Sequence, residues 1–91
     1  MNINILDQSF LKAVDIVNNL KKKPNDNELL KLYGLFKQAN QGNNNSPEPG
    51  YLDIKGQRKW TSWRSNIGKN QEQAKQEYIK FAMELFPKYN N

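Results

Sequence analysis

The sequence contains no cysteine and no histidine. Without cysteine the chain cannot form a disulfide, a thiol nucleophile or an iron–sulfur cluster, and without either residue the usual structural zinc sites are excluded. The missing histidine also removes the commonest metal ligand and the commonest general base. We therefore expect no metal site and few options for catalysis.

Long apolar runs are missing as well. The longest nearly apolar stretch, residues 29–36, contains Lys31 and is far too short to cross a bilayer. The first six residues lack a preceding basic region and are followed by Asp7, so they do not resemble a signal peptide. We expect a cytoplasmic protein.

The chain has 91 residues, of which only 36% are hydrophobic. That length suits one small domain, residues 1–91, and domains of this size bury about 60–65% of their unfolded surface. We therefore expect a single domain of modest stability with a thin core.

Positive charge is in surplus, with 14 Lys and Arg against 9 Asp and Glu and a net charge of +5. This surplus favours an anionic partner, but it does not choose among nucleic acid, a membrane surface and a phosphorylated metabolite. The only basic run, Lys21–Lys23, is typical of a solvated turn between helices, and no zinc finger, ribonucleoprotein motif or basic zipper is present.

The first helix is predicted from a single apolar stripe at helical spacing. Asp7 is in a position to cap its start and Pro24 to end it. The stripe consists of Phe10, Ala13, Val14, Val17 and Leu20.

A second helix is predicted to start at a capping box formed by Asn25 and Glu28. Apolar residues cover more than half of its circumference, so this helix either packs between two neighbours or shares its second face with a ligand. Gly34 in its interior costs about 1 kcal/mol relative to alanine, which favours a close approach by another element at that point.

Residues 40–50 are rich in Asn, Gly, Ser and Pro and are predicted to form a long loop, with the consecutive asparagines attributed to compositional bias. Residues 51–54 are expected to anchor the chain before a third helix that ends near Gly68. A second capping box, Asn70 with Gln73, predicts a fourth helix. No segment alternates with period two, so the prediction is an all-α protein with four helices.

The sequence offers no clear catalytic centre. The serines lack a histidine partner and a Gly-x-Ser-x-Gly setting, and no glycine-rich phosphate loop is present. We therefore expect that the protein is not an enzyme.

Two cation–aromatic pairs are candidates for ligand binding. Tyr33 and Lys37 share one face of the second helix at i,i+4 spacing, with Phe36 beside them, and Lys59 and Trp63 repeat the spacing on the third helix. A phenol hydroxyl beside an ammonium group suits a phosphate. The alternative is that these are amphipathic side chains at the edge of the core, with Trp60 and Trp63 as core anchors.

The same residues lie in two motifs, Tyr-x-x-aromatic-Lys-Gln-Ala at residues 33–39 and Leu-Asp-x-x-Gly-x-x-Lys-Trp at residues 52–60. In their order and spacing they resemble the acyl-CoA-binding protein family over nearly the whole chain. The resemblance implies an up-down-down-up four-helix bundle that binds long-chain acyl-CoA as its ligand and needs no cofactor.

The resemblance also implies roles for particular residues. Tyr33, Lys37 and Lys59 would hold the 3′-phosphate, Phe36 would lie beside the adenine, and Tyr78 would contact the CoA portion. The acyl chain would follow an apolar groove at Val14, Leu29 and Leu30. The sequence departs from the family pattern at Asn18, Phe36 and Glu48, which we expect to tune affinity without abolishing binding.

The leading hypothesis is a monomeric, non-enzymatic carrier that binds medium- and long-chain acyl-CoA esters, with transient contacts to acyl-CoA-using enzymes or membranes and no nucleic-acid partner. The alternative is a basic helical module that binds nucleic acid or an anionic membrane surface.

Overall fold

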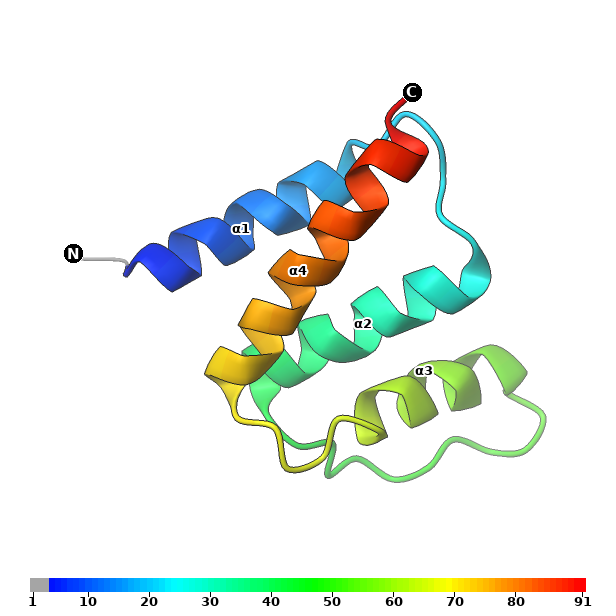
Figure 1. Cartoon of the computed structure of the whole chain (residues 1–91). Coiled ribbons are helices and arrows are strands. Elements are labelled where there is room, and N and C mark those ends of the chain that lie inside the picture. Colours follow the sequence, from blue (N-terminus) through cyan, green and yellow to red (C-terminus); the bar gives the residue numbers. More distant parts are fainter. Residues whose placement is uncertain (1–3) are drawn as a thin grey trace.

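The computed structural model describes residues 4–91 and contains four helices and no strand within that range. They are α1 (Ile5–Asn18), α2 (Asp26–Gln41), α3 (Ile54–Arg64) and α4 (Gln71–Tyr89), as Figure 1 shows. Figure 1 also shows that α2 and α3 run in the same direction, opposite to α1 and α4. The predicted all-α fold with up-down-down-up order is confirmed.

Helix α4 contacts both α1 and α2, and the opposite side of α2 contacts α3. The core lies where α1, α2 and α4 meet, and four of its members are alanines, which let the helices approach closely. The core residues are Phe10, Ala13, Leu32, Leu35, Ala39, Ala74, Tyr78, Ala82 and Leu85. The broad apolar surface of α2 thus packs between two neighbours, one of the two outcomes predicted for it.

The prediction for the ends of α1 was wrong at both ends. Asn4 caps the helix, because its Oδ1 accepts the N–H of Asp7 at 2.8 Å, while the Asp7 carboxylate pairs with Lys75 on α4 at 2.7 Å. The helix ends at Asn18, well before Pro24, and the side chain of Asn19 donates to the Asp15 carbonyl at 2.8 Å. The Asn19 side chain, which bonds the local backbone, therefore marks the end of the helix before the proline is reached.

Both predicted capping boxes are present. Asn25 accepts the Glu28 N–H while Glu28 accepts the Asn25 N–H, and Asn70 and Gln73 do the same at the start of α4. These reciprocal bonds satisfy backbone donors that a helix start leaves free, so a few adjacent residues suffice to set the boundary.

The predicted close approach at Gly34 is confirmed. A Cβ atom at this position would collide with the backbone carbonyl of Ser62 on α3. The Ser62 hydroxyl also donates to the carbonyl of Leu30, which joins α2 directly to α3. Glycine therefore sets the spacing of the α2–α3 seam.

The loop between α2 and α3 is held by asparagine and tryptophan side chains. Asn44 is fully buried, donates to the Trp60 carbonyl at 3.1 Å and accepts the Ser46 N–H at 3.0 Å. The Asn43 side-chain oxygen accepts a hydrogen bond from the Gln38 side-chain amide at 2.9 Å. Asn43 and Asn44 are therefore structural anchors of the loop, a role that composition alone did not predict.

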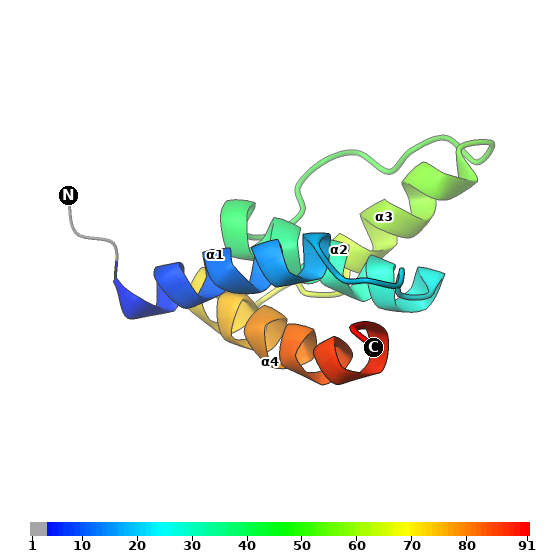
Figure 2. The same cartoon turned by 90° about the horizontal axis from the view of Figure 1, so that it is seen from above.

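The two tryptophans, which were predicted to be core anchors, bind the loop instead. Helix α3 has no buried residue, and the indole N–H groups of Trp60 and Trp63 donate to the loop carbonyls of Ser46 and Gly42 at 2.9 and 2.8 Å. Beyond these anchors the loop arches away from the helices (Figure 2), and Tyr51 and Leu52 at its far end are each 82% exposed. The apolar side chains of residues 51–54 therefore do not anchor the chain by packing, contrary to the expectation.

The C-terminal end of α4 is tied to the start of α2. Lys88 forms an ion pair with Glu28 at 2.7 Å, and the Tyr89 hydroxyl donates to the same carboxylate. The hydrogen bonds from Lys88 and Tyr89 lower the pKa of Glu28 from its ordinary 4.5 to about 2.

Across residues 4–91, none of the helices has both the length and the apolar character that a membrane span requires.

Candidate ligand-binding site

The two cation–aromatic pairs predicted on separate helices meet across the α2–α3 seam. Lys59 Nζ lies 5.4 Å from the ring centroid of Tyr33, and Lys37 Nζ lies 4.7 Å from that of Trp63. Each lysine therefore pairs with an aromatic ring of the other helix. Parallel α2 and α3, held close by Gly34, make this crossing possible.

Both lysines are available to an anion. Within the described part of the chain, no carboxylate pairs with Lys37 or Lys59, although three other lysines form ion pairs. A ring face attracts an ammonium group but leaves its N–H donors free on the solvent side. The structure thus brings together three predicted residues, Tyr33, Lys37 and Lys59, with two free cations and a phenol hydroxyl.

Beside this cluster lies a groove of about 620 Å³ between the first half of α2 and α3. We call it the basic groove. Leu29, Leu30 and Ile54 supply apolar surface, and Asp26 is the one carboxylate among its lining residues. The remaining lining residues are Lys23, Tyr33, Lys55, Arg58 and Lys59. An apolar surface with a cationic rim suits an anionic amphiphile.

Three aromatic side chains form a second cluster between α1, α2 and α4. The Phe10 ring lies 5.2 Å from Tyr78 and stacks with Phe36 at 6.1 Å between centroids. Phe36 is 37% exposed, so its ring offers a surface on which a planar group can stack, whereas Phe10 and Tyr78 are buried. Burial raises the pKa of Tyr78 from its ordinary 10 to about 12, so its hydroxyl remains a hydrogen-bond donor at neutral and mildly alkaline pH.

The predicted apolar positions fall into two groups. Leu29 and Leu30 line the basic groove, whereas Val14 packs against the core and does not line it. Sequence reasoning missed Lys55 and Arg58, which lie on the same face of α3 as Lys59 and Ile54. Their i,i+4 spacings, Ile54 to Arg58 and Lys55 to Lys59, were the available signal.

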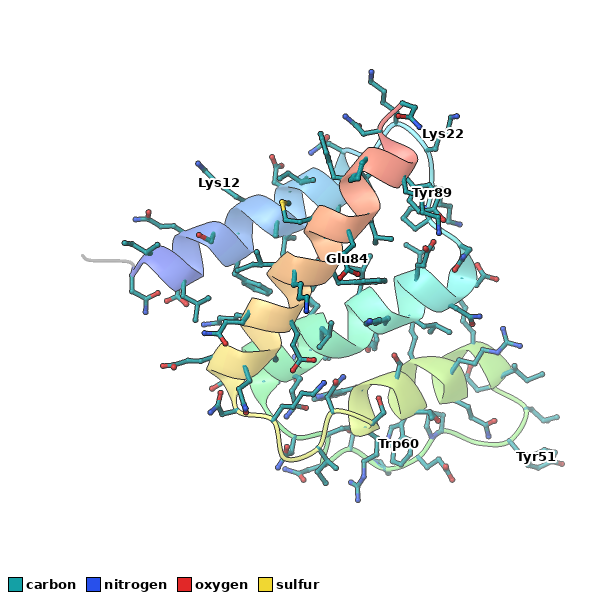
Figure 3. All side chains as sticks on the ribbon, viewed as in Figure 1. Lys12, Lys22, Tyr51, Trp60, Glu84 and Tyr89 are labelled. Atoms are coloured by element: carbon teal, nitrogen blue, oxygen red, sulfur yellow. The ribbon has the colours of Figure 1, made fainter. Side chains whose placement is uncertain are left out.

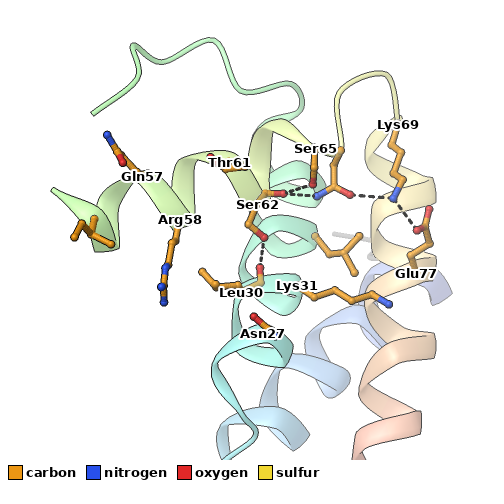
Figure 4. Close-up of a pocket in the computed structure, with 13 residues that line it drawn as sticks. Asn27, Leu30, Lys31, Gln57, Arg58, Thr61, Ser62, Ser65, Lys69 and Glu77 are labelled. Carbon is orange, nitrogen blue, oxygen red and sulfur yellow. Dashed lines mark hydrogen bonds and ion pairs between the residues drawn. The ribbon is translucent and has the colours of Figure 1, made fainter. Parts of the chain in front are cut away.

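A second groove, of about 840 Å³, lies on the other side of the seam, towards α4 (Figure 4). Leu30, Ile54 and Arg58 border both grooves. Its remaining lining residues are Asn27, Lys31, Leu35, Gln57, Thr61, Ser62, Ser65, Asn66, Lys69 and Glu77.

Six of the thirteen residues that line this larger groove carry amide or hydroxyl side chains. Lys69 is already engaged there, by Glu77 at 2.8 Å and by Asn66 at 2.9 Å. Lys31 lies over the Phe81 ring at 4.2 Å. The basic groove has four cationic lining residues against three in the larger groove, and none of its lysines forms an ion pair in the described chain, so it is the better site for an anionic amphiphile. Among residues 4–91, no group of three or more carboxylates is placed to hold a metal ion.

A family model described as "Acyl CoA binding protein" matches residues 7–82. The chain belongs to the acyl-CoA-binding protein family. Similar proteins include the acyl-CoA-binding protein homolog of Drosophila melanogaster, which is 46% identical over 93% of this chain and 99% of its own. The acyl-CoA-binding protein of Saccharomyces cerevisiae is 40% identical over 96% of this chain and all of its own.

Solved structures of the family agree with the fold. The crystal structure of acyl-CoA-binding protein 2 from Oryza sativa superposes with a TM-score of 0.87 at 30% identity and covers 91% of this chain and 90% of its own. The matched relatives give no support to the nucleic-acid alternative. The resemblance stated from the two sequence motifs is therefore confirmed.

Proposed function

We propose that this protein is a non-enzymatic carrier that binds medium- and long-chain acyl-CoA esters through a single domain, buffers their free concentration and delivers them to acyl-CoA-using enzymes or membranes. The observation that carries this proposal is the crossed pairing of Tyr33 with Lys59 and Lys37 with Trp63 at the end of an apolar groove. Family membership supports the same ligand class.

The polar end of the site suits the 3′-phosphate of CoA. Two ammonium groups and the Tyr33 hydroxyl can donate to it, and each charge-assisted hydrogen bond contributes about 1.5–3 kcal/mol. The exposed ring of Phe36 can stack on the adenine, and the protonated Tyr78 hydroxyl can donate to the CoA portion.

The apolar floor suits the acyl chain. Each methylene that leaves water contributes about 0.8 kcal/mol, so affinity is expected to rise with chain length until Leu29, Leu30 and Ile54 are covered. Val14, which packs against the core and does not line the groove, would contribute by supporting that packing.

The residue types present support a carrier that leaves its thioester ligand intact. The sequence has neither histidine nor cysteine, so the basic groove offers no imidazole base and no thiol nucleophile. We propose that it works as a cytoplasmic monomer without a cofactor. Asn18 and Glu48 are both exposed and would tune affinity.

Calorimetric titration tests this function directly with three ligands: long-chain acyl-CoA, free CoA and the 3′-dephospho form of the acyl-CoA. We expect the intact acyl-CoA to bind most tightly, with separate losses when the chain or the phosphate is removed. Equally weak binding of all three would refute the proposal.

Lys37→Ala tests the phosphate contact within the site. We expect acyl-CoA affinity to fall roughly 10- to 150-fold, which corresponds to the loss of one charge-assisted contact of about 1.5–3 kcal/mol. Lys12→Ala is the matched control, because Lys12 is exposed on α1 and extends away from the grooves (Figure 3). If Lys37→Ala weakens the 3′-dephospho ligand by the same factor, Lys37 does not bind the phosphate.

A further inference from the structure

The end of the loop before α3 carries a group of three exposed apolar side chains, of which only Ile54 belongs to the proposed ligand site. Of the nine large hydrophobic residues exposed in the described chain, three lie within residues 51–54: Tyr51 and Leu52 at 82% and Ile54 at 62%. We call Tyr51, Leu52 and Ile54 the apolar tip. Figure 3 shows Tyr51 extending outward from this end of the molecule. Clustered exposure of this kind marks an interaction surface more often than scattered single residues do.

The backbone of the tip is fixed, so the exposure does not reflect a loose chain. The Gly50 carbonyl accepts the Asp53 N–H at 2.9 Å and the Gln57 side-chain amide at 3.1 Å. The Asp53 carboxylate in turn accepts the Gly56 N–H at 2.9 Å as the N-cap of α3. This turn holds Leu52 and Tyr51 in solvent before any partner arrives, which lowers the entropic cost of a contact.

Cations follow the tip on the first turns of α3. Lys55, Arg58 and Lys59 follow it on α3, all three are exposed, and within residues 4–91 none of them forms an ion pair. Two carboxylates are also nearby in sequence, Asp53, which is engaged as the cap, and the exposed Glu48. The immediate surroundings are therefore cationic, and Lys23 adds a further positive charge at the rim of the basic groove.

We propose that the apolar tip inserts into the interface of an anionic lipid bilayer, with these cations on the lipid headgroups. Apolar and aromatic side chains flanked by Lys and Arg are the combination by which peripheral proteins bind such a surface. Ile54 belongs both to the tip and to the basic groove, so insertion places the open end of the groove at the lipid surface. That an acyl chain then passes between bilayer and groove rests on the proposed function, but the contact itself does not.

The test uses the full chain without ligand and sedimentation with vesicles of two compositions: phosphatidylcholine alone, or with about a third phosphatidylserine. We expect measurable binding to the anionic vesicles only, weakening as salt is raised. Tyr51→Ser combined with Leu52→Ser should reduce vesicle binding about tenfold, because two apolar side chains no longer leave water.

The matched control is Ile5→Ser combined with Leu11→Ser, a pair 81% and 57% exposed on α1, which should bind vesicles as the wild type does. Neither Tyr51 nor Leu52 lines the basic groove, so the tip variant should titrate acyl-CoA normally, which separates this proposal from the proposed function. Circular dichroism melting confirms that each variant is folded.

Three outcomes would overturn the proposal. They are absence of wild-type binding to anionic vesicles, equal loss in the tip and control variants, and a tip variant that changes self-association in sedimentation velocity while vesicle binding stays intact. The last result would assign the tip to contact between copies of the chain.

Discussion

Replacing Gly34 with alanine should destabilise the protein, although alanine is the better helix former. The substitution favours α2 by up to about 1 kcal/mol. Against this, the new Cβ would collide with the Ser62 carbonyl, and overpacking of this kind costs about 1–3 kcal/mol.

The Ser62 carbonyl cannot move away freely. It accepts hydrogen bonds from the Ser65 hydroxyl at 2.7 Å and the Asn66 amide at 3.1 Å. Relief must therefore come from separating α3 from α2, which breaks the hydrogen bond from the Ser62 hydroxyl to Leu30 at a cost of about 1 kcal/mol. The net expected loss is about 1–3 kcal/mol, or roughly 5–20 °C in melting temperature for a domain of this size.

Thermal or urea unfolding measures this loss, and Gly50→Ala is the control. A Cβ at Gly50 meets no atom within 4 Å, so its stability should stay within about 0.5 kcal/mol of wild type. Because Gly34 sets the distance between Tyr33 and Lys59, Gly34→Ala should also weaken acyl-CoA binding. A Gly34→Ala protein as stable as wild type and with unchanged affinity would refute the role assigned to the seam.

Two further predictions concern stability. Glu28 has a lower pKa in the folded state, about 2, than its ordinary 4.5, so its contribution is present above about pH 4.5 and is lost as the pH falls towards 2. The difference in unfolding free energy between wild type and Glu28→Gln should therefore shrink across that range, and a difference that stays constant with pH would contradict the assignment. Asn44→Ala should lower the free energy of unfolding in urea by about 1–3 kcal/mol, because it leaves the Trp60 carbonyl and the Ser46 N–H without their partner, whereas exposed Asn45→Ala should change it by less than about 0.5 kcal/mol.

The helix starts show which boundaries can be predicted from neighbouring residues alone. Asn25 and Glu28, like Asn70 and Gln73, are only three residues apart and satisfy each other's backbone groups, so the short local sequence was enough to predict both helix starts. At α1 the same reasoning chose Asp7 and failed, because the Asp7 carboxylate is engaged by Lys75 from α4 and Asn4 takes the cap. A distant partner competed successfully for the side chain.

In the candidate site, too, some features could be predicted from the sequence and others depend on how the helices pack. The i,i+4 spacings of Tyr33 with Lys37 and of Lys59 with Trp63 could be read directly from the sequence, and so could the family resemblance that joined them. That the lysines exchange aromatic partners across the seam could not be read from spacing, since it depends on how closely α2 and α3 approach at Gly34.

The sequence by itself thus determined the helical fold, most of its capping and the residue types of the candidate site, because those follow from periodicity and from the spacing of near neighbours. Tertiary structure alone decided that Asn44 and the two tryptophans hold the loop, that Val14 lies away from the basic groove and that residues 51–54 point into solvent. The physical reason is that a polar or apolar side chain takes whichever partner the packed helices bring near it, and that partner is often remote in the sequence.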